Sequence, residues 1–179
     1  MGLKIKDISF ILRLNKNTIT RYLNHLEEKL VKKYYSKIKP IGGKDVIVEI
    51  DESKFGKVKY NKGHWVEGVW VIGMTERTNE RKIILLAVPD RKKETLIDIL
   101  KKYVDKESII FSDSFKSYSS IKNEFAAHYK VNHSLYFVDP QTKVRMNTIE
   151  GNWNGVKQTI PIRKRTKKLI SLQLIRFLF

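Results

Sequence analysis

Apolar residues recur at helical spacing in two series near the start of the chain. The first series is Ile5, Ile8, Ile11 and Leu12, and the second is Ile19, Tyr22, Leu23 and Leu26. Between them lies Asn15, whose side chain can accept a hydrogen bond from a backbone N–H of the following turn. The pattern predicts two short helices within residues 4–31, joined at residues 13–15.

Farther along, short apolar and β-branched runs alternate with segments of helical spacing. We predict strands over residues 46–50, 64–74, 82–88, 108–112 and 134–138, and helices over 93–104, 118–125 and 148–157. This order, β-β-β-α-β-α-β-α, is typical of an α/β domain in which helices pack against a mixed sheet. Pro40, Gly42 and Gly43 indicate a linker before it. We therefore divide the chain into residues 1–36, a linker at 37–45 and a domain at 46–179.

The charge of the chain is strongly positive and unevenly placed. Among 179 residues there are 36 Lys and Arg against 19 Asp and Glu, which gives a formal net charge of +17. Residues 1–40 carry a net +7 and residues 143–179 a net +8. A nearly neutral centre between two basic ends favours a folded body whose flanks bind nucleic acid, because binding releases counterions from the phosphates. A solvated, lysine-rich surface is the alternative.

Composition excludes several classes of protein. The chain contains no cysteine, which excludes disulfides, thiolate zinc sites and a cysteine nucleophile. No apolar run approaches the ~18–20 residues that span a bilayer, and the first ten residues lack the layout of a signal peptide. We therefore expect an intracellular protein without a membrane partner, in the bacterial cytoplasm or nucleoid, or in the nucleus if the host is eukaryotic.

The two N-terminal helices resemble a helix-turn-helix, in which the second helix enters the major groove of DNA. The residues that this helix would present to DNA are Lys16, Asn17, Thr18, Thr20 and Arg21. Such a motif usually has a third, supporting helix, and none precedes this pair. Residues 1–36 are therefore interpreted as an incomplete DNA-binding segment, with an ordinary helical hairpin as the alternative.

Two predicted strands end in an acidic residue, Asp51 and Asp113. Carboxylates at the ends of neighbouring strands come close together, and their repulsion raises a pKa unless a cation lies between them. Magnesium suits such a pair, since it prefers carboxylate oxygens and retains several waters. Either acid alone is better explained as the start of a turn or the cap of a helix, but the pair favours a metal site. Glu52 points to the other side of the strand and is expected in a supporting or surface position.

A third acid lies near the end of the chain. Glu150 is the only acidic residue among residues 143–179, and Lys157 follows it after two helical turns on the same face, roughly 10 Å along the axis. Ile149, Trp153 and Val156 form another face that would pack on the sheet. An acid and a base so arranged can bind a metal and hold a phosphate beside it. The alternative is an exposed helix whose charges are accidental.

Five segments form an ordered set. They are residues 51–56 (DESKFG), 111–118 (FSDSFKSY), 131–134 (VNHS), 137–140 (FVDP) and 147–157 (NTIEGNWNGVK). Together they resemble the catalytic domain of insertion-sequence transposases of the DDE superfamily, in the group whose motif is D, D, E or N, then K. The resemblance extends from about residue 46 to residue 157. It implies a ribonuclease H-like fold, with Asp51 on the first strand, Asp113 after the fourth and Glu150 on a later helix.

The resemblance also implies an activity, namely Mg²⁺-dependent DNA cleavage and strand transfer at the ends of a mobile element. Asp51, Asp113 and Glu150 would hold two Mg²⁺ ions, for which Mn²⁺ substitutes, and Lys157 would bind the transferred strand. The partners would be the element ends and target DNA, bound by a homo-oligomer that is at least a dimer. Two alternatives stay open: a degenerate or domesticated relative that binds DNA without cutting it, and a ribonuclease H-like nuclease that acts on another nucleic acid.

Further residues are weaker candidates. Cationic side chains suited to the DNA backbone are Lys54, Arg163, Lys164 and Arg165. His133 could assist near the metals, although a structural hydrogen bond is the preferred explanation. The apolar residues at 169–179 indicate a shortened C-terminus.

Overall fold

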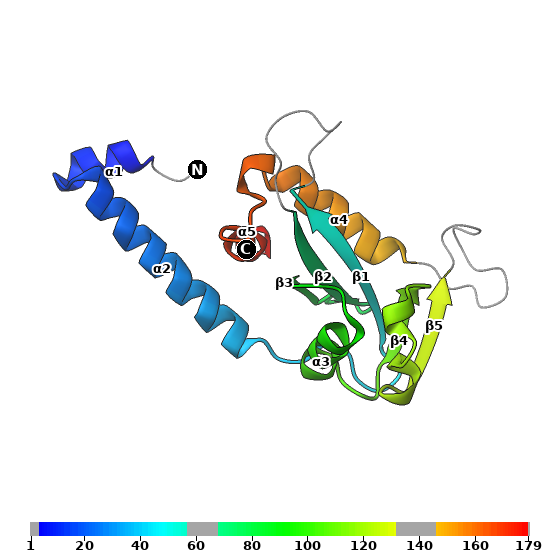
Figure 1. The fold of residues 1–179 in the computed structure, drawn as a ribbon. Helices are drawn as coiled ribbons and strands as arrows, with labels where there is room; N and C mark the ends of the chain where they lie inside the picture. Colours follow the sequence, from blue (N-terminus) through cyan, green and yellow to red (C-terminus); the bar gives the residue numbers. More distant parts are fainter. Residues whose placement is uncertain (1–3, 57–67, 132–145, 179) are drawn as a thin grey trace, which may run out of the picture. The chain divides into compact units, whose positions relative to one another are not determined.

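The computed structural model describes residues 4–56, 68–131 and 146–178. The chain divides into two compact units, Met1–Ile38 and Lys39–Phe179, and Figure 1 shows its course through both. His133 and the strand predicted at 134–138 lie outside the described residues. None of the described helices combines the length and the apolar composition needed to cross a membrane.

The first unit consists of two helices, α1 (Ile5–Leu12) and α2 (Lys16–Lys37), as the pattern predicted. α1 ends at Arg13, whose left-handed conformation, with φ of 52°, turns the chain. The Asn15 side chain accepts a 2.8 Å hydrogen bond from the N–H of Asn17 and so caps α2. α2 continues past the predicted limit at residue 31, since the lysine-rich segment that follows favours a helix and the first proline is Pro40.

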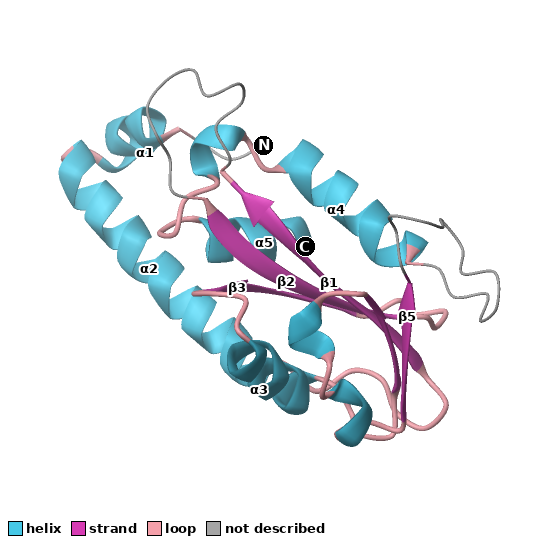
Figure 2. Ribbon diagram, turned by 45° about the vertical axis from the view of Figure 1, so that its right-hand side comes forward, coloured by secondary structure: helices cyan, strands magenta, loops and turns pink. Residues whose placement is uncertain are grey.

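The second unit, where the structure describes it, is built on a five-stranded sheet of order β3-β2-β1-β4-β5. The strands are β1 (Ile47–Phe55), β2 (Val69–Glu76), β3 (Ile83–Val88), β4 (Ile109–Asp113) and β5 (Ala127–Val131). β1 pairs antiparallel with β2 and parallel with β4, so the sheet is mixed. Figure 2 shows the strands between helices. The predicted α/β class is confirmed, and the arrangement is consistent with a ribonuclease H-like fold.

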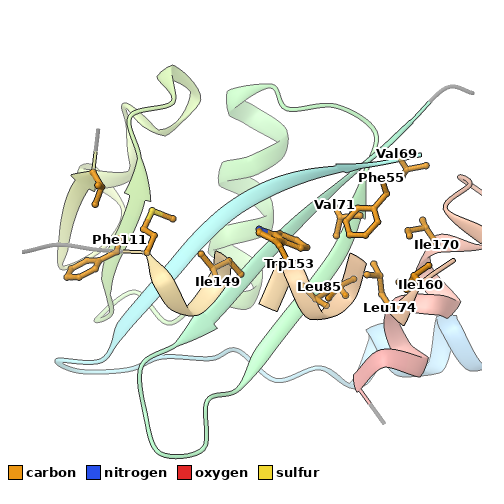
Figure 3. Packing of buried hydrophobic residues seen from close by; sticks show 13 residues of the cluster. Phe55, Val69, Val71, Leu85, Phe111, Ile149, Trp153, Ile160, Ile170 and Leu174 are labelled. Carbon is orange, nitrogen blue, oxygen red and sulfur yellow. The ribbon is translucent and has the colours of Figure 1, made fainter. Parts of the chain in front are cut away.

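Helices cover both faces of the sheet. In the described residues they are α3 (Lys93–Tyr103), α4 (Asn147–Thr159) and α5 (Ile170–Leu178), with single-turn 3₁₀ helices η2 (Lys116–Tyr118), η3 (Ile121–Asn123) and η4 (Ile162–Lys164) in the connections. α4 packs on β1 and β2, and α5 packs on β3 and α4. α3 lies on the opposite face from α4 (Figures 2 and 3). The apolar segment near the C-terminus is therefore a covering helix, with Leu172 and Leu174 buried.

The main hydrophobic core fills the space between the sheet and the pair α4 and α5. The ring of Phe55 meets the indole of Trp153 edge to face, with centroids 6.0 Å apart (Figure 3). Buried members of this core are Phe55, Val69, Val71, Leu85, Phe111, Val131, Met146, Ile149, Trp153, Val156, Ile160, Ile170 and Leu174. Side chains alternate along a strand, so Val69 and Val71 face α4 whereas Trp70 points to the other face.

The structure corrects two predicted boundaries. β1 does not end at residue 50 but pairs with β2 as far as Phe55, and it stops at Gly56, whose φ is 83°. The polar residues that follow Ile50 therefore continue the strand and do not form a turn. Every second side chain among them faces α4. Residues 39–45, predicted as linker, belong to the second unit, where Ile41 is buried and bridges to Val104.

Two further elements differ from the prediction. The helix expected over residues 118–125 is replaced by the 3₁₀ helices η2 and η3. β5 follows at Ala127–Val131, where no strand was predicted. As an edge strand it exposes Tyr129 and Lys130, so its apolar alternation is weak and the sequence pattern did not reveal it.

Candidate active site

Asp51 and Asp113 lie on neighbouring parallel strands, each two residues beyond the last paired residue of the ladder that joins them. That ladder runs from Ile47 with Ile109 to Glu49 with Phe111, and burial and the charge of Asp113 both raise the pKa of Asp51. Both side chains point to the same face of the sheet, because parallel strands in register alternate together. Asp51 is in the middle of β1 rather than at its end as predicted, whereas Asp113 does end β4.

α4 lies on that same face and touches Asp51 directly. The indole Nε1 of Trp153 donates a 2.9 Å hydrogen bond to Oδ2 of Asp51. The ring fits there because Gly73, which pairs with Asp51 across β1 and β2, has no side chain. A Cβ at Gly73 would lie 2.7 Å from Cζ2 of Trp153 and 2.8 Å from Cδ1 of Ile149. The glycine thus creates the space in which the tryptophan reaches the aspartate.

Electrostatics brings the third acid into the same neighbourhood. Burial raises the pKa of Asp51 to about 6, the Trp153 hydrogen bond opposes the rise, and the carboxylates of Asp113 and Glu150 add to it. Carboxylates act on one another in this way only when they are close and share a poorly solvated region. Asp113 is further held by its Oδ1, which accepts a 3.0 Å hydrogen bond from the N–H of Phe115.

Glu52 is a fourth carboxylate near these three. It is half-buried, and among the described residues its buried Oε1 has no hydrogen-bond partner. Burial, together with the charges of Asp51 and Asp113, raises its pKa to about 8, and the Arg91 guanidinium opposes the rise. Of the two positions expected for Glu52, supporting or surface, its partial burial favours the supporting one.

The start of α4, and with it Glu150, is tied to β1 through a buried acid. Glu49 is fully buried, and its Oε2 accepts a 2.8 Å hydrogen bond from the N–H of Ile149 while its Oε1 accepts a 2.5 Å bond from Nε of Arg77. The carboxylate satisfies a free N–H of the helix N-terminus and favours its dipole. Glu49 thus fixes the first turn of α4, which carries Glu150, against β1, which carries Asp51.

Lys157 lies at the other end of α4. It is exposed, and its Nζ lies 6.0 Å from the ring centroid of Phe55. Phe55 is four residues beyond Asp51 on the same face of β1, about 13 Å along the strand. The ammonium of Lys157 is thus on the α4 side of the sheet, beside Phe55 near the end of β1.

The carboxylates of Asp51, Asp113 and Glu150 are suitable ligands for Mg²⁺, but they do not surround a common position for an ion. Carboxylates are the ligands that this hard cation prefers. Within the described ranges 4–56, 68–131 and 146–178, however, no three Asp, Glu or His side chains are grouped tightly enough to hold a metal ion. Metal binding by Asp51, Asp113 and Glu150 therefore stays a prediction.

Of the residues predicted to face DNA from the first unit, Lys16, Asn17 and Arg21 are exposed, and Thr18 and Thr20 are partly buried. The hydroxyl of Thr20 donates a 2.8 Å hydrogen bond to the carbonyl of Lys16. The first turns of α2 therefore present two cations and an amide to solvent, and their contact with DNA stays a prediction.

The other cationic candidates have different surroundings. Lys54 is exposed, with its ammonium 5.4 Å from the ring centroid of Trp70. Arg163 is exposed and Lys164 partly so. Arg165 donates from Nε to the carbonyl of Ile160 over 2.9 Å and from Nη2 to the carbonyl of Lys157. Arg165 thus caps the end of α4, a structural role that the basic cluster in the sequence did not suggest.

Sequence reasoning missed the residues that support the acids. Trp153 was expected only to pack on the sheet, because it shares an apolar helix face with Ile149 and Val156. Gly73 lies within an apolar strand and gave no signal beyond its small size. Glu49 precedes Asp51 by two residues in a strand, and this spacing, which places both on one face, was the available clue.

Comparison with known proteins identifies the family. Residues 39–163 match the family model of the ISXO2-like transposase domain. An uncharacterized transposase-like protein of Haemophilus influenzae is 30% identical over 77 residues, which are 43% of this chain and 61% of that protein. The chain thus spans less than two-thirds of the length of this curated relative.

A solved structure, the NurA nuclease from Sulfolobus solfataricus, aligns with 98% of this chain and 56% of its own, at 18% identity and a TM-score of 0.21. This likeness is too weak to support an argument. The family match, by contrast, covers more than half of the chain and includes the strands of Asp51 and Asp113 and the helix of Glu150. The chain therefore belongs to the family of ISXO2-like transposase domains.

Proposed function

We propose that the protein catalyses metal-dependent cleavage and strand transfer of DNA at the ends of a mobile element. Asp51, Asp113 and Glu150 would hold two Mg²⁺ ions, and ions held there would supply Lewis-acid activation of a water or 3′-hydroxyl and charge stabilisation of the leaving oxygen. The observation that supports the proposal is that Asp51 lies on a strand next to that of Asp113, and that, besides burial, the charges of Asp113 and Glu150 both raise its pKa.

The chain's own residues would position the acids and the DNA. Trp153 donates to one oxygen of Asp51 and so would help to orient that carboxylate. Glu49 holds the first turn of α4 and with it Glu150. Lys157, as an exposed point charge on the same helix, would hold a phosphate of the strand. Most of the rate enhancement would come from this positioning and from charge stabilisation at the phosphate.

The first unit would supply further DNA contacts. Lys16, Asn17 and Arg21 at the start of α2 would reach DNA, as in a helix-turn-helix. Strand transfer requires two element ends, so we also propose that a homo-oligomer assembles on the DNA. The net charge of +17 supports a polyanionic partner.

The test uses the full chain with Mg²⁺ or Mn²⁺ and labelled DNA that carries the ends of the element. Wild type is expected to cut and join, and Asp113→Asn to lose cleavage while it still binds DNA. Asp113 is suited to this test because its side chain is partly exposed, so the variant should fold. Asp98→Asn, at an exposed position of α3, is the matched control and should cut like wild type.

Two results would replace this proposal with another. Binding to element ends without cleavage by wild type, under either metal, would indicate a DNA-binding relative that has lost catalysis. Cleavage of an RNA–DNA hybrid in preference to element-end DNA would indicate a nuclease of different substrate class.

A further inference from the structure

A cationic pocket lies at the end of the sheet where β1 finishes, β2 begins and β3 ends. Its volume is about 510 Å³ and its lining includes Lys54, Trp70, Arg91, Lys167 and Asp90. Trp70 points to the sheet face opposite Gly73 and Asp51, but the pocket borders the carboxylates through Arg91, which contacts Phe115, the residue whose N–H is bonded to Asp113. We call it the Arg91 pocket.

Two aromatic rings hold the guanidinium of Arg91. Its Cζ is 3.7 Å from the ring centroid of Trp70 and 4.8 Å from that of Phe115. Stacking of this kind occupies the flat faces of a guanidinium, while its N–H donors lie in the plane and point outward. Within the described part of the chain, no carboxylate forms a salt bridge with Arg91, including Glu52, which acts on it only at longer range. Within the described residues, the guanidinium donors are therefore not paired with a carboxylate.

The described lining of the pocket holds more basic than acidic residues, with Lys54, Arg91 and Lys167 against Asp90. The Oδ1 of Asp90 is already engaged, because it accepts hydrogen bonds from the N–H of Lys92 over 3.0 Å and from the hydroxyl of Thr95 over 2.7 Å. A planar guanidinium with ammonium groups nearby is the arrangement that binds a phosphate: two parallel N–H bonds from the arginine, and point charges from the lysines.

We propose that the Arg91 pocket binds a backbone phosphate of the DNA strand on which the enzyme acts. This inference rests on the proposed function. Lys54 is three residues from Asp51 on β1, about 10 Å along the strand. A phosphate at Arg91 would thus lie within a few nucleotides of the reacting phosphate and would set which phosphate reaches the carboxylates. The contact is to the backbone and carries no base sequence.

The test measures DNA binding by the full chain in the Asp113→Asn background, without divalent metal, so that cleavage plays no part. Fluorescence anisotropy over a range of salt concentrations gives the dissociation constant and its salt dependence. Arg91→Gln should weaken binding about tenfold on element-end and unrelated DNA alike, and should reduce the salt slope by about 1. Arg91→Lys, which keeps the charge but loses the paired N–H donors, should recover only part of the affinity.

Lys93→Gln is the matched control, since it removes one exposed positive charge two residues away and outside the pocket. Equal effects of Arg91→Gln and Lys93→Gln would overturn the inference, because only net charge would then matter. Lys54→Gln, at an exposed position, should act in the same direction as Arg91→Gln and covers the case in which Arg91→Gln fails to fold.

Inorganic phosphate separates a DNA contact from a site for the free anion. If the pocket serves DNA, millimolar phosphate at constant ionic strength should not reduce DNA binding by wild type more than that by Arg91→Gln. Saturable competition by phosphate that disappears in Arg91→Gln, with DNA affinity otherwise unchanged by the substitution, would overturn the inference. If the wild-type protein binds DNA through Arg91 but does not cleave it under any condition tested, the proposed function is refuted. The inference that the Arg91 pocket binds a DNA phosphate would still hold.

Discussion

The indole N–H of Trp153 and the carboxylate of Asp51 are joined by a 2.9 Å hydrogen bond that links α4 to the middle strand of the sheet. The bond orients the Asp51 carboxylate, which the backbone N–H of Glu52 also helps to hold. Groups that hold a metal ligand in this way commonly affect affinity nearly as much as the ligands themselves. The bond therefore has both a structural and a functional consequence.

The variant Trp153→Phe should separate the structural consequence of this hydrogen bond from the functional one. The variant keeps an aromatic ring in the core but removes the donor, so Asp51 loses its fixed orientation. We expect affinity for Mn²⁺ to fall roughly 10- to 100-fold, measured by electron paramagnetic resonance of free Mn²⁺, with a parallel loss of cleavage. Phe55→Leu is the control, because it loosens the same aromatic contact and leaves the N–H in place. Equal Mn²⁺ affinity in wild type and Trp153→Phe would contradict the role given to the hydrogen bond.

Gly73→Ala tests the space beneath the indole. The new methyl group would meet Trp153 and Ile149 at 2.7 and 2.8 Å, and overpacking of a core usually costs about 1–3 kcal/mol. We expect a loss of that size in the free energy of unfolding, measured by urea denaturation. Gly151→Ala in α4 is the matched control. Nothing lies within 4 Å of its Cβ position, so the substitution should stabilise the helix by up to about 1 kcal/mol. A neutral Gly73→Ala would show that the indole can move aside.

Arg77→Met tests the buried acid beneath the start of α4. Glu49 is fully buried, and its charge is paired with the Nε of Arg77 over 2.5 Å. Removal of one partner leaves a buried carboxylate with only the N–H of Ile149, so unfolding should become easier by about 3 kcal/mol. The comparison is Lys101→Met, which breaks a partly exposed pair with Glu124 and should change the urea midpoint little. A small effect of Arg77→Met would contradict the stabilising role given to the pair of Arg77 and Glu49.

His128 should make stability depend on pH. Burial, aided by the nearby Lys130 ammonium, lowers the pKa of His128 to about 4 from 6.5, and its Nε2 lies 2.8 Å from the hydroxyl of Ser112. Between these two values the unfolded chain binds more protons than the folded one. The free energy of unfolding should therefore rise with pH between about 4 and about 6.5. The contribution of His128 to stability is lost when the pH falls through this range. His128→Gln should show a shallower rise in urea denaturation across this range. Identical slopes for both proteins would rule out His128 as the titrating group.

The sequence predicted the fold well where the apolar pattern was strong. α3 is predicted over 93–104 and observed at Lys93–Tyr103, and β3 over 82–88 and observed at Ile83–Val88. The pattern failed where polar residues continue a strand. Asp51 was placed at a strand end because Glu52 and Lys54 follow it, but these side chains alternate with buried Ser53 and Phe55, and pairing with β2 decides the length.

The candidate site was predictable in its acids but not in its supports. The resemblance singled out Asp51, Asp113 and Glu150, and the structure brings all three into one electrostatic neighbourhood. The hydrogen bond from Trp153 could not be foreseen, since it depends on a glycine in another strand, 80 residues earlier in the chain. The Arg91 pocket likewise gathers residues from β1, β2 and the ends of other elements, which no local pattern connects.

The bond between Glu49 and the N–H of Ile149 also bears on which sequence changes the fold can accept. It anchors the first turn of α4 to β1 at a point next to Glu150, so a contact between residues 100 positions apart helps to set where that acid lies. Relatives of this chain should therefore retain the same placement of the acid on α4 wherever a carboxylate occupies the position of Glu49.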